Sequence, residues 1–229
     1  MKFTNKKVFN FDGAVRGMRN PMNSWNKSDS WQSDFTDDSK GGFVIGTNDM
    51  KLAQQLIRAG SEHRKFLRQI TVSVDITAPL YWWKEYDTYK VGTTANSTST
   101  MHKISTTPIT LDCFETDDYD GNVICGGTFE CPEVVGVQFE EIFIGRLEFL
   151  RQKYVETKDI KYWKELIRWL PSSWLQTRTI TMNYENLYSI IRHRRNHKLT
   201  EWSDSFIDWC KTLPYSDELL FLDLDKKGD

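Results

Sequence analysis

Residues 70–76 constrain the fold of this chain more than any other segment does. Apolar and polar residues alternate there without exception, with Ile70, Val72, Val74 and Ile76 separated by Thr71, Ser73 and Asp75. Successive side chains of a β-strand point to opposite faces, so this period-two pattern predicts a strand with one buried and one polar face. The chain therefore contains a sheet, and the other segments must supply what covers it.

Helical patterns surround this strand. Apolar residues recur on one face of several segments, and one such segment is bounded by Asp159 as an N-cap and by Pro171 as a stop. A second β-rich stretch covers residues 177–182. These patterns together predict an α+β fold. The helices are expected at 48–59, 80–89, 140–155, 159–170, 184–195 and 199–210.

The chain of 229 residues suits a single domain spanning 1–229. Nine Trp, nine Tyr and thirteen Phe can build a sizeable core. Residues 1–47 are rich in Asn, Ser, Asp and Gly, so we expect irregular structure there. We also expect loops over 91–100 and 105–137, the latter with a short hairpin, and a flexible charged tail at 223–229.

Charge and cysteine content exclude several classes of function. Thirty basic residues face 32 acidic ones, a formal charge of −2, which gives no overall attraction to nucleic acid or to an anionic membrane. No stretch approaches 18 apolar residues, and the N-terminal segment does not resemble a secretory signal. The four Cys match no zinc-site spacing. We therefore expect a cytoplasmic protein with reduced thiols.

The first candidate site is the aromatic segment 81–90. Four charged residues, Lys84, Glu85, Asp87 and Lys90, stand among its Tyr and Trp residues. Burial of a charge is costly unless it is paired or holds a ligand. They could pair with one another at helical spacing. Alternatively the segment forms a pocket wall, where aromatic rings stack on a flat ligand and Lys90 meets a phosphate.

Two further segments carry polar chemistry. Residues 92–102 are dominated by hydroxyl and amide side chains that could donate to an anion, although the segment lacks the ending of a phosphate-binding P-loop. Residues 192–198 form a basic helix end, for which solvated charges are the default interpretation and a nucleic-acid patch is an alternative. His193 and His197 are four residues apart, but no carboxylate completes a metal-binding pattern, so no metal is expected.

Three blocks occur in an informative order. The first is 14–19, which contains a pair of arginines, and the second runs from a helix ending at Gly60 through strand 70–76 and Ala78-Pro79 to Asn96-Ser97-Thr98-Ser99. The third consists of Leu170-Pro171, Asn183, Leu187 and Arg194. In order and spacing, these blocks resemble the flavin-dependent thymidylate synthase family.

This resemblance implies a short antiparallel sheet with packed helices, assembled into homotetramers. It also implies a methyltransferase of nucleotide biosynthesis. Such an enzyme acts on dUMP with FAD as cofactor, methylenetetrahydrofolate as one-carbon donor and NADPH as reductant.

The resemblance also assigns residues. Arg194 falls on the arginine that contacts the pyrimidine, and its catalytic role would be to stabilise developing charge. Glu85 falls near a nucleotide-contacting Gln, and Asn183 on an Asn near the flavin. The remaining assignments are Lys90, Asn96, Ser97 and Ser99 to the substrate phosphate, and Tyr89, Lys90 and His193 to the cofactor.

One departure bears directly on function. The family signature Arg-His-Arg-x-x-Ser-x-Asn-Glu-x-Ser-x-Arg-Tyr keeps only Asn96 and Ser99 here, and its first triplet falls on Tyr89-Lys90-Val91 or one residue earlier. A lysine cannot replace the bidentate fork of an arginine. An alternative function is therefore a non-catalytic or repurposed nucleotide-binding protein that has lost flavin binding.

Overall fold

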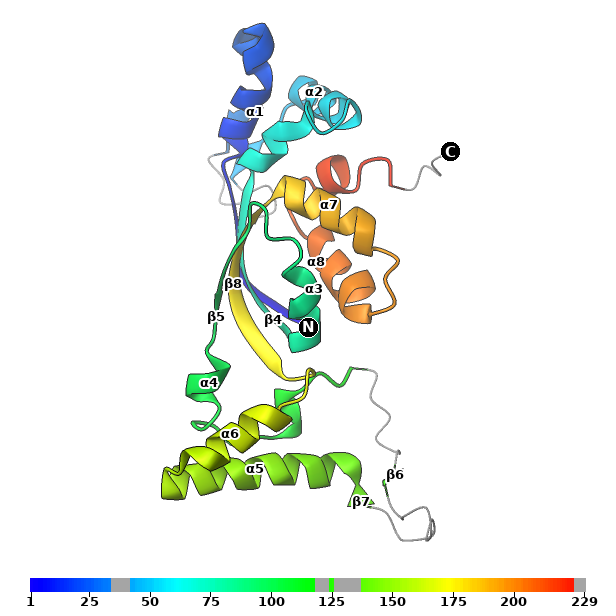
Figure 1. Ribbon diagram of the computed structural model, residues 1–229. Helices are drawn as coiled ribbons and strands as arrows, with labels where there is room; N and C mark the ends of the chain where they lie inside the picture. Colours follow the sequence, from blue (N-terminus) through cyan, green and yellow to red (C-terminus); the bar gives the residue numbers. More distant parts are fainter. Residues whose placement is uncertain (34–41, 118–123, 126–136, 225–229) are drawn as a thin grey trace. The chain divides into compact units, whose positions relative to one another are not determined.

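The computed structural model describes residues 1–33, 42–117, 124–125 and 137–224. These residues form two compact units, which are considered separately below (Figure 1). The first unit comprises Met1–Ile76, Glu85–Asn96 and Arg178–Asp229, and the second comprises Thr77–Lys84 and Ser97–Thr177.

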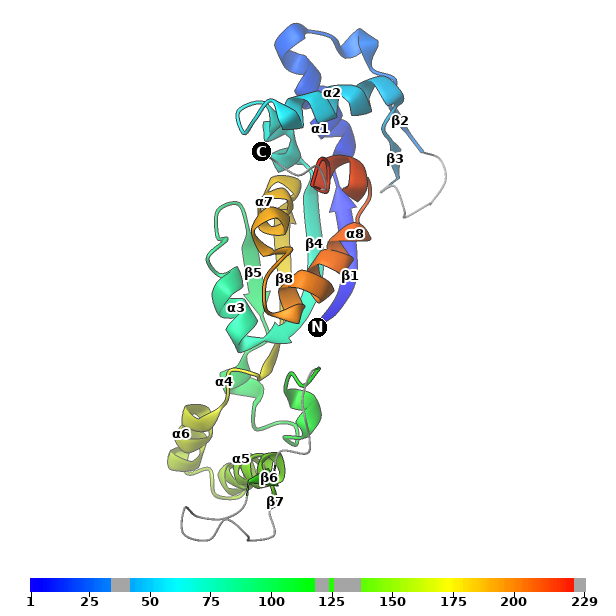
Figure 2. The ribbon, with the colours of Figure 1, turned by 90° about the vertical axis from the view of Figure 1, so that its right-hand side faces the viewer.

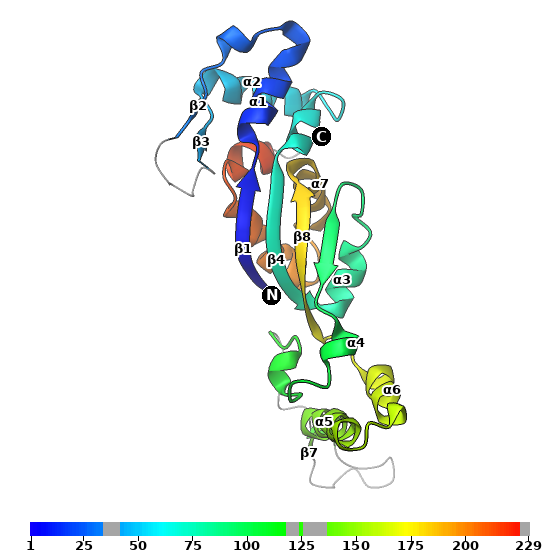
Figure 3. The ribbon, with the colours of Figure 1, turned by 90° about the vertical axis from the view of Figure 1, so that its left-hand side faces the viewer.

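A four-stranded sheet organises the fold. Its order is β1-β4-β8-β5, and neighbouring strands run in opposite directions (Figure 3). The strands are β1 Lys2–Phe9, β4 Thr71–Pro79, β5 Thr94–Ser97 and β8 Leu175–Asn183. The predicted strands at 70–76 and 177–182 are confirmed as β4 and β8, each slightly longer than expected, and the short antiparallel sheet is confirmed as well.

One face of β4 is apolar and the other is polar, as its sequence requires. Val72 and Val74 are fully buried. On the opposite face Asp75 accepts hydrogen bonds from the side chains of Asn5 on β1, at 2.7 Å, and Thr179 on β8, at 2.6 Å. These two bonds, Thr179 foremost, lower the pKa of the Asp75 carboxyl. A row of polar side chains thus links three adjacent strands.

Helices of the first unit cover one face of this sheet (Figures 1 and 2). The predicted helix at 184–195 is confirmed as α7, and its apolar residues Leu187, Ile190 and Ile191 are all buried. The predicted helix at 199–210 is divided into a π-helical turn and a short α-helix. The bounds are α7 Tyr184–Arg194, η6 Glu201–Phe206, α8 Ile207–Lys211 and the π-helical turn η7 Ser216–Leu220.

The expectation of irregular structure over residues 1–47 is wrong for much of that segment. It contains an edge strand, a helix and several short elements. The strand β1 escaped prediction because most of its residues are exposed and polar, and the helix because two glycines interrupt its sequence. The elements are β1, α1 Phe11–Arg19, the 3-10 turns η1 Asn20–Met22 and η2 Trp25–Lys27, β2 Trp31–Gln32 and β3 Phe43–Val44.

A buried ion pair holds this segment to the next helix, α2 Thr47–Arg58. Asp49, in the first turn of α2, is 0% exposed, and Arg19 at the end of α1 is 6% exposed. Besides Arg19, the Asp49 carboxylate accepts hydrogen bonds from the hydroxyls of Ser28 and Ser30, each at 2.6 Å. The helix expected at 48–59 thus begins one residue earlier than predicted, and its N-cap is Gly46.

The aromatic helix is shorter than predicted and starts one residue after the strand ends. β4 continues through Pro79, so that proline belongs to the strand, and α3 spans Leu80–Tyr86. The expected loop at 91–100 instead contains the exposed strand β5. A 3-10 helix, η4 Arg64–Gln69, precedes β4. Among the described residues, no helix combines the length and apolar character that a membrane crossing requires.

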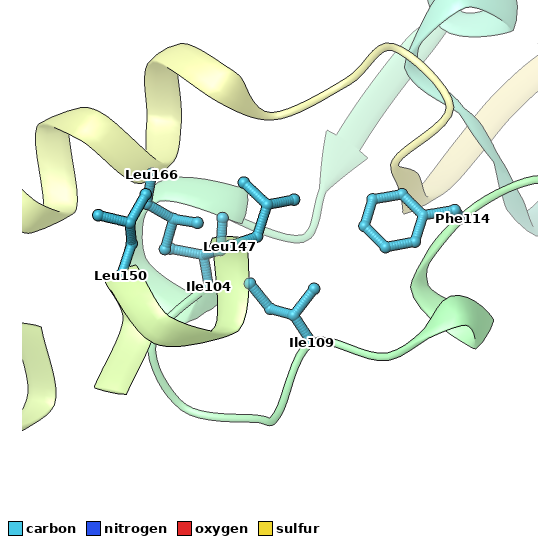
Figure 4. Packing of buried hydrophobic residues seen from close by; sticks show 6 residues of the cluster. All are labelled: Ile104, Ile109, Phe114, Leu147, Leu150 and Leu166. Carbon is cyan, nitrogen blue, oxygen red and sulfur yellow. The ribbon is translucent and has the colours of Figure 1, made fainter. Parts of the chain in front are cut away.

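The second unit is built on two packed helices that confirm the sequence patterns. They are α5 Phe139–Thr157 and α6 Ile160–Trp169, and the side chain of Asp159 caps α6 as expected. Figure 4 shows the buried cluster beside them, which includes Leu147 and Leu150 of α5. Its other members are Ile104, Ile109, Phe114 and Leu166.

Shorter elements complete the second unit. These are α4 Thr100–Lys103, the 3-10 turn η5 Leu111–Cys113 and the expected short hairpin, formed by β6 Ile124–Cys125 and β7 Val137–Gln138. The rest of the predicted loop region, 118–123 and 126–136, lies outside the described residues. The Glu148 carboxylate of α5 binds Arg151 through two nitrogens and accepts the backbone N–H of Ile109 at 2.8 Å.

Candidate functional site

The carboxylate of Glu85 is the centre of a charged and aromatic cluster in the first unit. Its Oε2 atom accepts a hydrogen bond from the indole N–H of Trp202 at 2.7 Å and lies 3.1 Å from Nη1 of Arg194. The Nε2 atom of His197 is 3.6 Å from the same oxygen. Glu85 remains 34% exposed, so the cluster faces solvent on one side.

Helix α7 brings Arg194 into this cluster. Arg194 follows the buried Ile190 and Ile191 by four and three residues, which places it on the helix face that is turned inward. Its Nε atom donates to the hydroxyl of Tyr89 at 2.9 Å. The guanidinium carbon lies 5.6 Å from the centre of the Tyr89 ring and 5.2 Å from that of Trp202, within cation–π range.

The chain beside Glu85 is fixed by its own partners. Tyr86 is buried, and Asp87 forms an ion pair of 3.0 Å with Arg178 on β8. One of the two interpretations of segment 81–90 was that its charged residues pair with one another, but both carboxylates pair with arginines from elsewhere in the chain. Glu85 of α3 pairs with Arg194 of α7, and Asp87, which follows α3, pairs with Arg178 of β8.

The turn at Val91 and Gly92, which follows α3 in the sequence, is held against the first residues of α7. The Asn183 side chain caps this helix by accepting the N–H of Asn186, and the Asn186 amide donates to the carbonyl of Val91 at 2.7 Å. Gly92 has φ of +77°, and a Cβ there would lie 3.1 Å from Nδ2 of Asn183. Glycine is therefore favoured both by the backbone conformation and by the close approach. Asn183, assigned to the flavin by resemblance, also has this structural role.

The other predicted site residues are placed as follows. Lys90, on the turn just described, is exposed, and so are Asn96 on the edge strand β5 and His193 on α7. Ser97 and Ser99 belong to the second unit, where both are exposed. Within the first unit, the structure thus brings together Glu85, Tyr89 and Arg194 of the predicted set.

The basic segment 192–198 is not the solvated helix end that its sequence predicted. Arg192 and Arg195 donate to backbone carbonyls near the C-terminus, and Arg194 pairs with Glu85. His193 and His197 have different surroundings, since His197 approaches Glu85 and His193 is exposed. In the parts of the chain that the structure describes, no group of three or more His, Cys, Asp or Glu is placed to hold a metal ion.

Trp202 and His197 are site residues that sequence reasoning did not assign. A buried indole N–H usually has an acceptor, which is the signal that Trp202 offered, but nothing in the sequence identified Glu85 as that acceptor. The resulting cluster has two aromatic rings, a guanidinium with further N–H donors and a carboxylate. Such a set suits a flat ring with polar edges.

Comparison with known proteins rests on structure alone. No protein-family model and no curated protein matches the sequence. Two crystal structures of the flavin-dependent thymidylate synthase ThyX from Helicobacter pylori, both complexed with FAD and dUMP, match 97% of this chain with a TM-score of 0.63. The match covers 99% and 98% of their chains at 16% sequence identity.

The fold is that of the flavin-dependent thymidylate synthases. The fold predicted from the three sequence blocks is therefore confirmed over nearly the whole chain. The ThyX-like fold places residues distant in the sequence, such as Glu85 and Arg194, into one cluster. At 16% identity the similarity establishes architecture, and any chemistry must be argued from this chain's own residues.

Proposed function

We propose that this chain binds a deoxyuridylate-type nucleotide at the Glu85–Arg194 cluster and methylates it in a flavin-dependent reaction. The observation that carries the proposal is the position of Arg194, which lies beside the rings of both Tyr89 and Trp202 on a ThyX-like fold. Its N–H groups can hold the pyrimidine oxygens and stabilise the charge that develops there. A folate carbon and a nicotinamide complete the set of reactants.

A flavin is compatible with the residues around this cluster. A flavin is a flat ring attached to phosphate, so it needs an aromatic or amide surface and a cation. Tyr89 supplies a ring, Asn183 an amide that lies beside the Gly92 turn, and Lys90 an exposed ammonium, with His193 as a further donor. When bound, the flavin supplies hydride transfer between the nicotinamide and the alkylated pyrimidine.

A specific observation favours a second candidate, a repurposed nucleotide-binding protein without flavin. Arg194 already has a carboxylate partner 3.1 Å away in Glu85, which neutralises its charge. The turn that carries Lys90 lacks the signature arginines. A site with reduced positive charge retains the donors and acceptors for a nucleotide base but stabilises a developing negative charge less well.

The visible absorption spectrum of the purified protein separates the two candidates. The protein is mixed with FAD and desalted. Flavin bands retained near stoichiometry support the enzyme, and conversion of dUMP to dTMP with methylenetetrahydrofolate and NADPH then tests the reaction itself. A colourless protein that is stabilised by dUMP against thermal unfolding supports the repurposed binder.

The nucleotide site itself is tested with a matched pair of variants. Arg194→Gln should remove thermal stabilisation by dUMP, because it removes the guanidinium from the cluster. Arg168→Gln makes the same change at a side chain that is 67% exposed on α6, and it should leave that stabilisation intact. Equal responses of the two variants would place the nucleotide elsewhere and refute both candidates.

We also propose a homotetramer, which the family resemblance implies. Light scattering at micromolar concentration measures the assembly directly, and a monomer would contradict this proposal. Light scattering and the nucleotide test use the same purified protein, and neither result depends on the other.

A further inference from the structure

Four arginines line a cavity of about 390 Å³ in the first unit. Arg58 ends helix α2, Arg64 begins η4, and Arg192 and Arg195 belong to the last turn of α7 and its C-cap. This concentration of positive charge contrasts with the chain as a whole, whose formal charge is −2. The cavity is lined by neither Glu85 nor Arg194, so it is distinct from the nucleotide cluster.

The two arginines of α7 are held by backbone carbonyls. Arg192 donates to the carbonyl oxygens of Leu220 at 2.9 Å and Leu222 at 3.0 Å, and Arg195 donates to that of Leu224 at 2.7 Å. These bonds fix the guanidinium groups in place. A carbonyl is neutral, so it satisfies an N–H donor without cancelling the charge of the arginine.

The other two arginines have carboxylate partners. Arg64 pairs with Glu185 at 3.0 Å, and Arg58 pairs with Asp223 at 2.6 Å. Asp223 itself lines the cavity. Two carboxylates therefore face four guanidinium groups, and among the described lining residues the balance is positive.

The positive groups are also crowded. The guanidinium carbon of Arg192 lies 3.2 Å from the centre of the Tyr188 ring, and that of Arg64 lies 4.6 Å from the same centre. Burial lowers the pKa of Arg192, and the nearby charges of Arg64 and Arg195 lower it further. Like charges held together in a partly buried place attract an anion strongly.

We propose that this cavity binds the diphosphate group of a small phosphorylated molecule, which displaces the carboxylate of Asp223. A guanidinium group matches two phosphate oxygens at once, and two linked phosphates can reach more than one arginine. The cavity volume of about 390 Å³ lies within the range of roughly 300–1,000 Å³ that is typical of small-molecule sites. Asp223 occupies the site as an internal counter-ion when no ligand is bound.

The test is calorimetric titration of the full chain with inorganic pyrophosphate at fixed ionic strength. Arg195→Gln removes a cavity cation and should weaken binding about tenfold, the equivalent of about 1.4 kcal/mol. Asp223→Asn removes the internal competitor and should tighten binding several-fold. The exposed Arg168→Gln, with the same charge change as Arg195→Gln, should bind as the wild type does.

Other results would overturn the proposal. They are the absence of pyrophosphate binding by the wild type, equal weakening by Arg195→Gln and Arg168→Gln, or unchanged or weaker binding by Asp223→Asn. Loss of binding in Arg194→Gln would also overturn it, since it would place pyrophosphate in the nucleotide cluster. Circular dichroism of each variant establishes that it is folded. If Arg195→Gln does not fold, Asp223→Asn still tests the proposal.

Discussion

Replacement of Asp49 by Asn should destabilise the first unit more than any exposed substitution. The Asp49 carboxylate is fully buried and accepts hydrogen bonds from Arg19, from the hydroxyls of Ser28 and Ser30, and from the backbone N–H of Asp29. Burial raises the pKa of Asp49, but the bonds from Ser28, Ser30 and Arg19 together outweigh it, and the net shift is downward. The carboxylate is thus held in its charged form.

The magnitude follows from what Asn leaves behind. Arg19, only 6% exposed, would lose its counter-ion and remain as a buried charge, and one acceptor oxygen would become a donor facing other donors. Removal of one partner from a buried ion pair costs about 3–5 kcal/mol. For a chain of this length such a loss corresponds to a fall in Tm of about 10 °C.

Urea denaturation followed by circular dichroism, with hydrogen exchange of α2, measures this loss. Asp12→Asn makes the same change at an exposed position of α1 and should cost less than about 0.5 kcal/mol. Adding Arg19→Met to Asp49→Asn removes the unpaired charge and should recover part of the loss. A loss below about 1 kcal/mol for Asp49→Asn, or further destabilisation in the double variant, would refute the reasoning.

Three more outcomes are expected. Trp202→Phe keeps a ring but removes a donor to Glu85, so it should cost about 1 kcal/mol in urea denaturation and weaken nucleotide binding. Gly92→Ala should cost about 1–2 kcal/mol, because its φ of +77° disfavours a Cβ; a neutral result would contradict the assigned turn. Hydrogen bonds from Arg151 foremost, and also from Ile109 and Gln152, lower the pKa of Glu148 from 4.5 to about 2. The ionised Glu148 therefore stabilises the folded state above pH 4.5, and this stabilisation is lost as the pH falls toward 2. With screening by water it amounts to about 1 kcal/mol. In Glu148→Gln the free energy of unfolding should fall less between pH 4.5 and pH 2 than in the wild type. The same pH profile of stability in both proteins would contradict this assignment.

The elements that sequence predicted well are those whose signals are local. The alternation of 70–76 and the cap at Asp159 each depend on neighbouring residues, and both are confirmed. The sequence did not predict helix α1, although its apolar residues have helical spacing, because the high Asn, Ser, Asp and Gly content of residues 1–47 favours irregular structure. A Cβ at Gly17 would lie 2.3 Å from the side-chain oxygen of Gln69, so this glycine permits close packing within a regular helix.

Three of the residues that the resemblance assigned lie in one cluster, but the sequence did not predict the contacts between them. Glu85 and Arg194 were both assigned through family resemblance, and they do lie together. Their pairing was not predicted, because the only partners that sequence spacing suggested for Glu85 lie within its own segment, 81–90. The bond between Trp202 and Glu85 joins residues 117 positions apart, and no local pattern encodes which partner a buried indole will find.

The hydrogen bonds that join β4 to β1 and β8 have a consequence for the synthesis of the chain. Asp75 bonds to Asn5 across 70 residues of sequence and to Thr179 across 104. On the ribosome, β4 emerges with only β1 available as a neighbour, and its other edge stays open until β8 has been made. Non-local pairing of this kind is slow, and an open apolar strand is prone to aggregate. Truncated chains that end before Leu175 should therefore accumulate as insoluble protein, whereas full-length synthesis closes that edge.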